Sequence, residues 1–195
     1  MSRDFTSIQR NRLAAIALGG NSPVRGSGPA ETIVAALAEI SREAGDIVAV
    51  SRFFRTPAYP AGSGPGFVNA AALVRTALAP EALLRVLHGI EGRYGRERLT
   101  RWGARTLDID LIAVEDRILP DEPTLRHWID LPPARQRMEA PDRLILPHPR
   151  LQDRAFVLIP LAEIAPLWRH PLTGRTVAEM TAALSGADKS AICPL

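Results

Sequence analysis

The sequence contains one cysteine, Cys193, among its 195 residues. A single cysteine forms no disulfide within the chain, which excludes the small disulfide-stapled domains of secreted proteins and favours a reducing compartment. We therefore expect a cytoplasmic protein. Long apolar runs are missing too, because no stretch approaches the ~20 residues that a membrane-spanning helix needs. The short run from Leu13 to Leu18 follows a basic segment but leads into Gly19-Gly20-Asn21, which we expect to form a turn, so it predicts a buried strand and not a secretory signal.

A strong excess of one charge is also absent, since the formal net charge is only +3. The isoelectric point is nevertheless near 9.7, because arginine is abundant, and this suits an anionic small molecule or nucleic acid equally well. With 46% hydrophobic and 23% charged residues, a chain of this length buries one good core. We expect a flexible tail over residues 1–12 and a single domain over 13–195.

The periodicity predicts strands and helices in alternation. Apolar residues at helical spacing predict two helices, which begin at Pro29 and at Pro80, and Gly45 ends the first. The predicted strands are Leu13 to Leu18, Ile47 to Arg55, Phe67 to Thr76 and Leu107 to Ile112. The order β-α-β-β-α-β predicts an α+β fold, the ferredoxin-like antiparallel sheet with helices packed on it, followed by a C-terminal helical extension. This fold hosts many activities, so function has to come from the site.

Five arginines and one tryptophan lie between Arg93 and Arg105, directly before the acid-bearing strand. On a strand Asp108 and Asp110 share one face, with backbones roughly 6.6 Å apart. Two such carboxylates suit a pair of divalent ions about 3.5 to 4 Å apart, and guanidinium forks suit the phosphate oxygens between them. Each feature alone has a plain alternative, a solvated arginine surface or an edge strand with its polar face in water. Together they favour a site for phosphate and metal.

Several motifs carry a resemblance to a known family. They are Gly19-Gly20-Asn21, Phe54-Arg55-Thr56-Pro57, Phe67-Val68-Asn69-Ala70-Ala71, Arg101-Trp102-Gly103-Ala104-Arg105-Thr106-Leu107-Asp108-Ile109-Asp110, Pro147-His148-Pro149-Arg150 and Arg154-Ala155-Phe156-Val157. In this order they resemble the 6-hydroxymethyl-7,8-dihydropterin pyrophosphokinases of folate biosynthesis. The resemblance implies transfer of pyrophosphate from ATP to the pterin alcohol, which gives AMP and the pterin diphosphate. It extends from about Leu13 to Pro171.

The resemblance implies a pterin site in which a flat heterocycle stacks on an aromatic ring while an amide binds its polar edge. The residues that it implies for the pterin are Thr56, Pro57, Ala58, Tyr59, Phe67, Asn69 and Phe156. Phe67 and Asn69 share a strand face. Without the resemblance, both phenylalanines would be interpreted as core residues. Asn69 is harder to explain as core, because a buried amide needs partners.

For ATP the resemblance implies a largely cationic set, namely Glu91, Arg96, Arg98, Arg101, Trp102, Ile109, His148 and Arg154. It also implies two Mg²⁺ ions held by Asp108 and Asp110, with Arg98 and Arg105 as catalytic phosphate stabilisers. His148 alternatively reads as a turn residue between prolines, and Glu91 as a surface acid at a helix end. No motif supplies a nucleophile or general base, so positioning and charge neutralisation have to provide the rate.

Two other functions remain open at this point. An RNA-binding domain of the same fold would carry an aromatic pair on its sheet, and no such motif is present. A different two-metal transferase or nuclease would keep both aspartates but would not need Asn69. We expect a monomer that binds neither nucleic acid nor membrane. An insertion at about 121–142 has no counterpart in the resemblance and reads as a helical flap beside the nucleotide, a partner surface or an inert excursion.

Overall fold

The computed structural model describes residues 11–24, 26–57, 64–95, 106–136 and 138–195. The strands are β1 (Arg12–Gly20), β2 (Asp46–Val50), β3 (Phe54–Thr56), β4 (Phe67–Thr76), β5 (Asp108–Val114) and β6 (Cys193–Pro194). The helices are α1 (Pro29–Glu43), α2 (Pro80–Arg93), α3 (Glu122–Ile129), α4 (Pro133–Gln136), α5 (Ala155–Ile164), α6 (Val177–Ala183) and α7 (Gly186–Ser190). No helix in these ranges has the length and apolar character needed to cross a bilayer.

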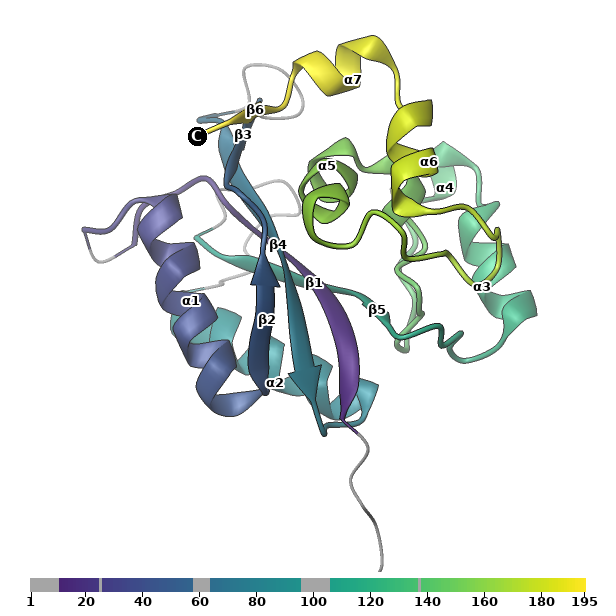
Figure 1. Ribbon diagram of the computed structural model, residues 1–195, viewed down its shortest axis with the longest axis horizontal. Coiled ribbons are helices and arrows are strands. Elements are labelled where there is room, and N and C mark those ends of the chain that lie inside the picture. The colour runs from purple at the N-terminus through teal and green to yellow at the C-terminus, as the bar shows by residue number, and fades with distance from the viewer. Residues whose placement is uncertain (1–10, 25, 58–63, 96–105, 137) are drawn as a thin grey trace, which may run out of the picture.

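The described strands form one antiparallel sheet in the order β5-β1-β4-β3-β6 (Figure 1). The central strand β4 pairs with β1 along one edge, and with β2 and then β3 along the other. The two helices after β1 and β4 connect the strands of a split βαβ arrangement. The expected α+β architecture with helices on an antiparallel sheet is therefore confirmed.

Helices α1 and α2 begin at the predicted prolines, and α1 ends at Glu43, just before the predicted stop at Gly45. Each has a proline in its first turn, where the missing backbone N–H is not needed. After α1 the chain turns at Gly45, whose φ of +139° suits glycine, and a Cβ there would lie 2.2 Å from the carbonyl oxygen of Arg75. The turn therefore lets the chain enter β2 against the end of β4.

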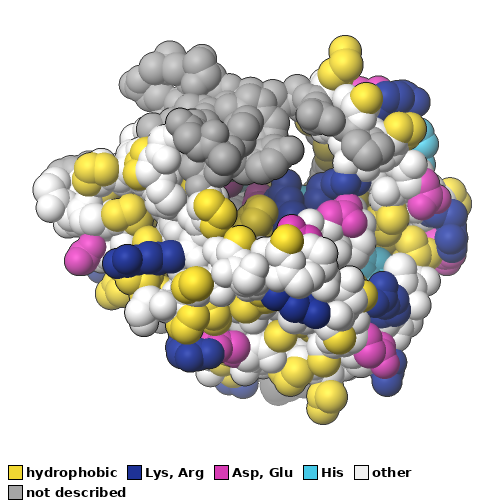
Figure 2. Space-filling model, turned by 90° about the horizontal axis from the view of Figure 1, so that it is seen from above, with side chains coloured by type: hydrophobic (Ala, Val, Ile, Leu, Met, Phe, Trp, Pro, Cys, Tyr) yellow, Lys and Arg dark blue, Asp and Glu magenta, His cyan; other side chains and the backbone are white. Residues whose placement is uncertain are grey.

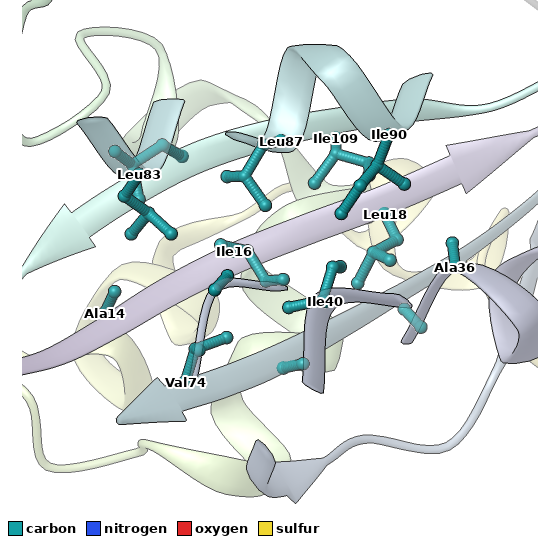
Figure 3. Packing of buried hydrophobic residues seen from close by; sticks show 14 of the residues in the cluster. Ala14, Ile16, Leu18, Ala36, Ile40, Val74, Leu83, Leu87, Ile90 and Ile109 are labelled. Carbon is teal, nitrogen blue, oxygen red and sulfur yellow. The ribbon is translucent and has the colours of Figure 1, made fainter. Parts of the chain in front are cut away.

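The main core lies between the sheet and helices α1 and α2. Figure 3 shows Leu83, Leu87 and Ile90 of α2 pointing at Ile16 of β1 and Ile109 of β5, all fully or almost fully buried. Full burial of side chains of this size contributes about 1.5–3 kcal/mol each. This packing fixes β5 beside β1 and therefore fixes the direction in which its alternate residues face.

A second apolar cluster lies on the opposite face of the sheet, under α5 and α6. Ala17, Ala71 and Ile112 of the sheet pack there against buried residues such as Val157 and Met180 of the helices. Helix α6 is the predicted C-terminal packing helix, and the side chain of its cap Thr176 accepts from the backbone N–H of Glu179. Helices α5 and α6 cover the part of this face that carries Ala17, Ala71 and Ile112.

Two details differ from the sequence prediction. The strand expected over Ile47 to Arg55 is interrupted, because the Ser51 hydroxyl accepts from the Ala71 N–H and the backbone N–H of Arg52 donates to Glu163 Oε2 of α5. In the segment between β2 and β3, these side-chain bonds take the place of regular pairing with β4. The turn expected at Gly19-Gly20 is instead the end of β1.

The two chain ends also hold contacts that the sequence did not indicate. Strand β1 begins at Arg12, inside the stretch expected to be a flexible tail, and its guanidinium donates to the Ala77 and Leu78 carbonyls. Residues 1–10 of that tail lie outside the described residues. Strand β6 pairs with β3, and the Leu195 N–H donates to the Phe53 carbonyl at 2.8 Å. The carboxyl end therefore supports the strand that carries Thr56.

Candidate active site

Two rows of paired residues cross the sheet at its functional end. In one row Asn69 of β4 and Asp108 of β5 both pair with Gly19 of β1, the strand between them. In the next such row on this face, Ala71 and Asp110 both pair with Ala17. Paired residues on neighbouring strands project from the same face, and strands lie about 4.8 Å apart. The amide predicted for the pterin and the acid predicted for metal therefore share one face across roughly 9.6 Å.

Gly19 leaves room for the side-chain amide of Asn69. A Cβ at Gly19 would lie 2.6 Å from Asn69 Oδ1, closer than a carbon and an oxygen tolerate. The amide is fixed, because Asn69 is buried and its Nδ2 donates to Thr56 Oγ1 at 2.9 Å. The partner expected for this amide is therefore Thr56 of β3. The early glycine motif serves this close contact and not a turn.

The two predicted aromatic residues lie at the margin of the fold. Phe67 begins β4 and is half-buried, while Phe156 in the first turn of α5 is 39% exposed. Neither belongs to the apolar clusters, so their alternative interpretation as core residues is wrong. The guanidinium of Arg154 lies 5.7 Å from the centre of the Phe156 ring, which holds that ring beside the charged part of the site.

Asp108 and Asp110 are both half-buried on β5, and Ile109 between them faces the core. Asp110 Oδ2 accepts from Arg154 Nη1 at 2.9 Å, and both side chains are about one-third exposed. Within the described ranges, no cluster of three or more His, Cys, Asp or Glu residues is present. Two carboxylates fit Mg²⁺, which typically takes one or two protein carboxylates and completes its shell with substrate phosphates and water.

His148 lies beside the Asp110–Arg154 ion pair, and a hydrogen bond fixes its tautomer. Its Nδ1 accepts from the backbone N–H of Arg150 at 3.0 Å, so the proton of the neutral ring lies on Nε2. Burial, followed by the nearby charge of Arg154, lowers the pKa of His148 to about 4, against a smaller opposing effect of Asp110. At neutral pH the ring is therefore uncharged and offers one N–H donor.

A cavity of about 590 Å³ extends along the outer edge of β5. It brings together Ile109, Asp110, His148 and Arg154, all predicted from the sequence. Figure 2 looks onto this end of the molecule, where basic and acidic side chains meet near the centre of the view. The lining residues that sequence reasoning missed are Leu84, His88, Leu111, Trp128, Gln136, Glu139, Ala140, Pro141, Asp142, Arg143, Leu144, Ile145, Pro149 and Arg150. Arg150 belongs to the motif Pro147-His148-Pro149-Arg150. For the insertion, the sequence did not indicate which residues line the cavity.

The remaining predicted residues divide into two groups. Glu91 is 1% exposed, so its interpretation as a surface acid is wrong, and its Oε1 accepts from the Ile109 N–H at 2.6 Å. It links α2 to β5 and is absent from the cavity wall. Pro57 follows β3 and is exposed. The other predicted residues, which are Ala58, Tyr59, Arg96, Arg98, Arg101, Trp102 and Arg105, lie outside the described residues.

Comparison with known proteins identifies the chain as an α+β enzyme of the pyrophosphokinase class. A family model described as 7,8-dihydro-6-hydroxymethylpterin-pyrophosphokinase (HPPK) matches residues 15–166. The chain belongs to this family.

Curated relatives agree with the family match. A 2-amino-4-hydroxy-6-hydroxymethyldihydropteridine pyrophosphokinase of Synechocystis is 35% identical over 93% of this chain and 80% of its own length. The protein of the same name from Pseudomonas aeruginosa is 39% identical over 86% of this chain and 89% of its own. At these coverages the resemblance is not confined to one motif.

Solved structures support the fold alone. A crystal structure of Plasmodium falciparum HPPK-DHPS superposes with a TM-score of 0.65 at 16% identity, over 91% of this chain. The chain spans 46% of the length of that protein.

Proposed function

We propose that this protein transfers pyrophosphate from ATP to 6-hydroxymethyl-7,8-dihydropterin, giving AMP and the pterin diphosphate, as a step of folate biosynthesis. The observation that carries the proposal is the row in which Asn69 and Asp108 flank Gly19 on one face of the sheet. A pterin bound at Asn69 has its hydroxymethyl group within reach of phosphates bound at the aspartates. The 590 Å³ cavity beside Asp110 supplies room for the donor.

The proposal includes two Mg²⁺ ions at Asp108 and Asp110. Asp108 and Asp110 would hold these ions, because two half-buried carboxylates are oxygen donors of the kind that Mg²⁺ prefers. When bound, Mg²⁺ would supply charge neutralisation for the phosphates of ATP. In the proposed reaction the hydroxymethyl oxygen attacks the β-phosphorus in line and AMP leaves.

The side chains of the site then position the pterin and neutralise charge on the phosphates. Asn69 presents its fixed amide to the polar edge of the pterin, and Phe67 or Phe156 offers a ring for stacking. Arg154 pairs with Asp110 and is placed to bind a phosphate oxygen next to it. His148 offers a neutral Nε2–H, and its low pKa keeps it from serving as an acid at neutral pH. Without a general base, most of the rate comes from positioning and electrostatics.

Further parts of the proposal rest on the resemblance. Arg98 and Arg105 remain predictions as phosphate stabilisers, and so do Arg96, Arg101 and Trp102 at the nucleotide. Glu91 stays a predicted neighbour of the nucleotide only through its bond to β5. A monomeric, cytoplasmic enzyme is likewise our expectation.

Two variants separate the halves of the proposed site. Asn69→Ala should weaken binding of hydroxymethylpterin, measured calorimetrically with Mg²⁺ and a non-hydrolysable ATP analogue, about tenfold or more, as expected for losing a paired buried amide. Binding of the ATP analogue itself should change less than twofold. Asp110→Asn should abolish turnover while the urea unfolding midpoint stays close to that of the wild type. Equal losses of pterin and ATP affinity in Asn69→Ala would overturn the pterin assignment.

A further inference from the structure

The insertion at 121–142 is an ordered part of the described fold. Helix α3 is capped by Asp121, whose carboxylate accepts from the Thr124 N–H at 2.8 Å. Leu125 of this helix is fully buried. The insertion is joined to the cavity by Gln136 of α4, whose Oε1 accepts from Arg150 Nη2 and whose Nε2 donates to the Leu131 carbonyl. These bonds place α4 of the insertion against the cavity wall.

The cavity that this insertion borders has two different sides. Leu84 of α2 and Leu144 pack on the main core and give it an apolar side. Asp110, Arg150 and Arg154 give it a charged side. Arg150 binds Asp153 Oδ2 at 2.9 Å, yet its buried Nη1 has no hydrogen-bond partner among the described residues. A ligand with an anionic part and an apolar, flat part would match both sides.

Trp128 of α3 contributes an aromatic ring to the wall of this cavity. The indole is half-buried and meets His127 edge-on, with ring centres 5.9 Å apart. Its Nε1–H donates to no group in the described part of the chain. An amphipathic ring left part-open on a cavity wall is suited to a planar heterocycle, since stacking needs only a π-face and the free N–H suits a polar edge.

We propose that Trp128 contacts the purine base of ATP, so that the 121–142 insertion forms the nucleoside-side wall of the donor site. This rests on the proposed function, because it requires the cavity to hold ATP. The phosphates then occupy the charged side, and the base lies between the α2 side and the insertion. Among the three interpretations of the insertion that the sequence left open, the proposal corresponds to the helical flap beside the nucleotide.

The test measures binding calorimetrically in Mg²⁺ for three ligands, a non-hydrolysable ATP analogue, AMP and inorganic tripolyphosphate. Trp128→Ala should raise the Kd of the ATP analogue and of AMP about 5- to 150-fold, the range of base stacking on an aromatic side chain. The Kd of tripolyphosphate should change less than twofold. Trp128→Phe should restore most of the affinity, because it keeps a flat ring.

The matched control is Met138→Ala, which removes a large apolar side chain of the same insertion that is 80% exposed and does not line the cavity. It should leave all three affinities unchanged. Trp128→Leu serves if the alanine variant unfolds, since it keeps an apolar side chain without the ring, and it should lose ATP affinity in the same way.

Three outcomes would overturn the inference. ATP affinity that is unchanged in a folded Trp128→Ala or Trp128→Leu variant would show that the ring makes no contact. A parallel loss of tripolyphosphate binding would show that the insertion acts on phosphate or on the fold. Wild-type protein that binds no nucleotide would overturn both the proposed function and this inference. If the wild type forms the pterin diphosphate, a negative result with the Trp128 variants counts against this inference alone.

Discussion

Gly19→Ala tests the geometry that joins the two halves of the site. The added Cβ would lie 2.6 Å from Asn69 Oδ1, so the amide has to withdraw. Asn69 is 6% exposed and held by Thr56 at 2.9 Å, so withdrawal breaks that bond inside the protein. Leaving a buried polar group without its partner costs about 1–3 kcal/mol. The backbone of a strand accepts alanine readily, so this contact is the main cost.

The expected result is a matching loss in stability and in pterin binding. The free energy of unfolding in urea should fall by about 1–3 kcal/mol. The Kd of hydroxymethylpterin, measured with Mg²⁺ and an ATP analogue, should rise roughly 5- to 150-fold, and the Kd of the ATP analogue alone should hardly change. Gly89→Ala is the control, because nothing lies within 4 Å of a Cβ at that position of α2. This variant should keep the wild-type affinity for the pterin. It should also raise the free energy of unfolding by up to about 1 kcal/mol, because Gly89 lies at an exposed position of the helix.

A double-mutant cycle gives the decisive comparison. In an Asn69→Ala background the new methyl group has no amide to displace, so Gly19→Ala should cost little further stability. The coupling between the two changes should therefore reach about 0.5–3 kcal/mol, as for side chains in contact. Additive losses, or a folded Gly19→Ala protein with unchanged pterin affinity, would refute the reasoning.

Two further predictions concern groups beside the site. Glu91→Ala leaves the buried N–H of Ile109 without its acceptor and should lower the free energy of unfolding in urea by about 1–3 kcal/mol. Glu91→Gln keeps an acceptor and should cost less; equal costs for both would contradict the role of this bond. His148 has a folded pKa near 4, below its ordinary value of 6.5, so the unfolded chain binds the proton first as pH falls. The contribution of His148 to the free energy of unfolding is complete above about pH 6.5 and declines toward pH 4. In urea unfolding series, the difference in free energy of unfolding between wild type and His148→Gln should therefore shrink as the pH falls over this range. A constant difference would contradict the lowered pKa of His148.

The sequence predicted those parts of the fold that follow from local periodicity. Helices α1 and α2 have prolines in their first turns and apolar residues at helical spacing, and both lie at the expected positions. The interrupted strand over Ile47 to Arg55 depended instead on Arg52 reaching Glu163, a residue more than a hundred positions away. Such a contact leaves no periodic signal in the sequence.

The candidate site shows the same division. Asp108 and Asp110 could be placed on one face because a strand alternates. The sequence could not show that Gly19 separates Asn69 from Asp108, because this depends on the register of two strand pairs. The burial of Glu91 could not be predicted from the sequence, because it depends on how α2 packs against β5. Trp128 was unassigned because the wall that it joins exists only in the tertiary fold.

The measurement that bears most directly on the central claim follows the phosphates of ATP through one turnover. The protein should be incubated with hydroxymethyldihydropterin, Mg²⁺ and ATP labelled at the γ-phosphate, and the products separated chromatographically. Attack at the β-phosphorus predicts AMP and labelled pterin diphosphate in equal amounts, and predicts neither product with Asp110→Asn. Formation of ADP with a pterin monophosphate, or full product yield from Asp110→Asn, would contradict the account.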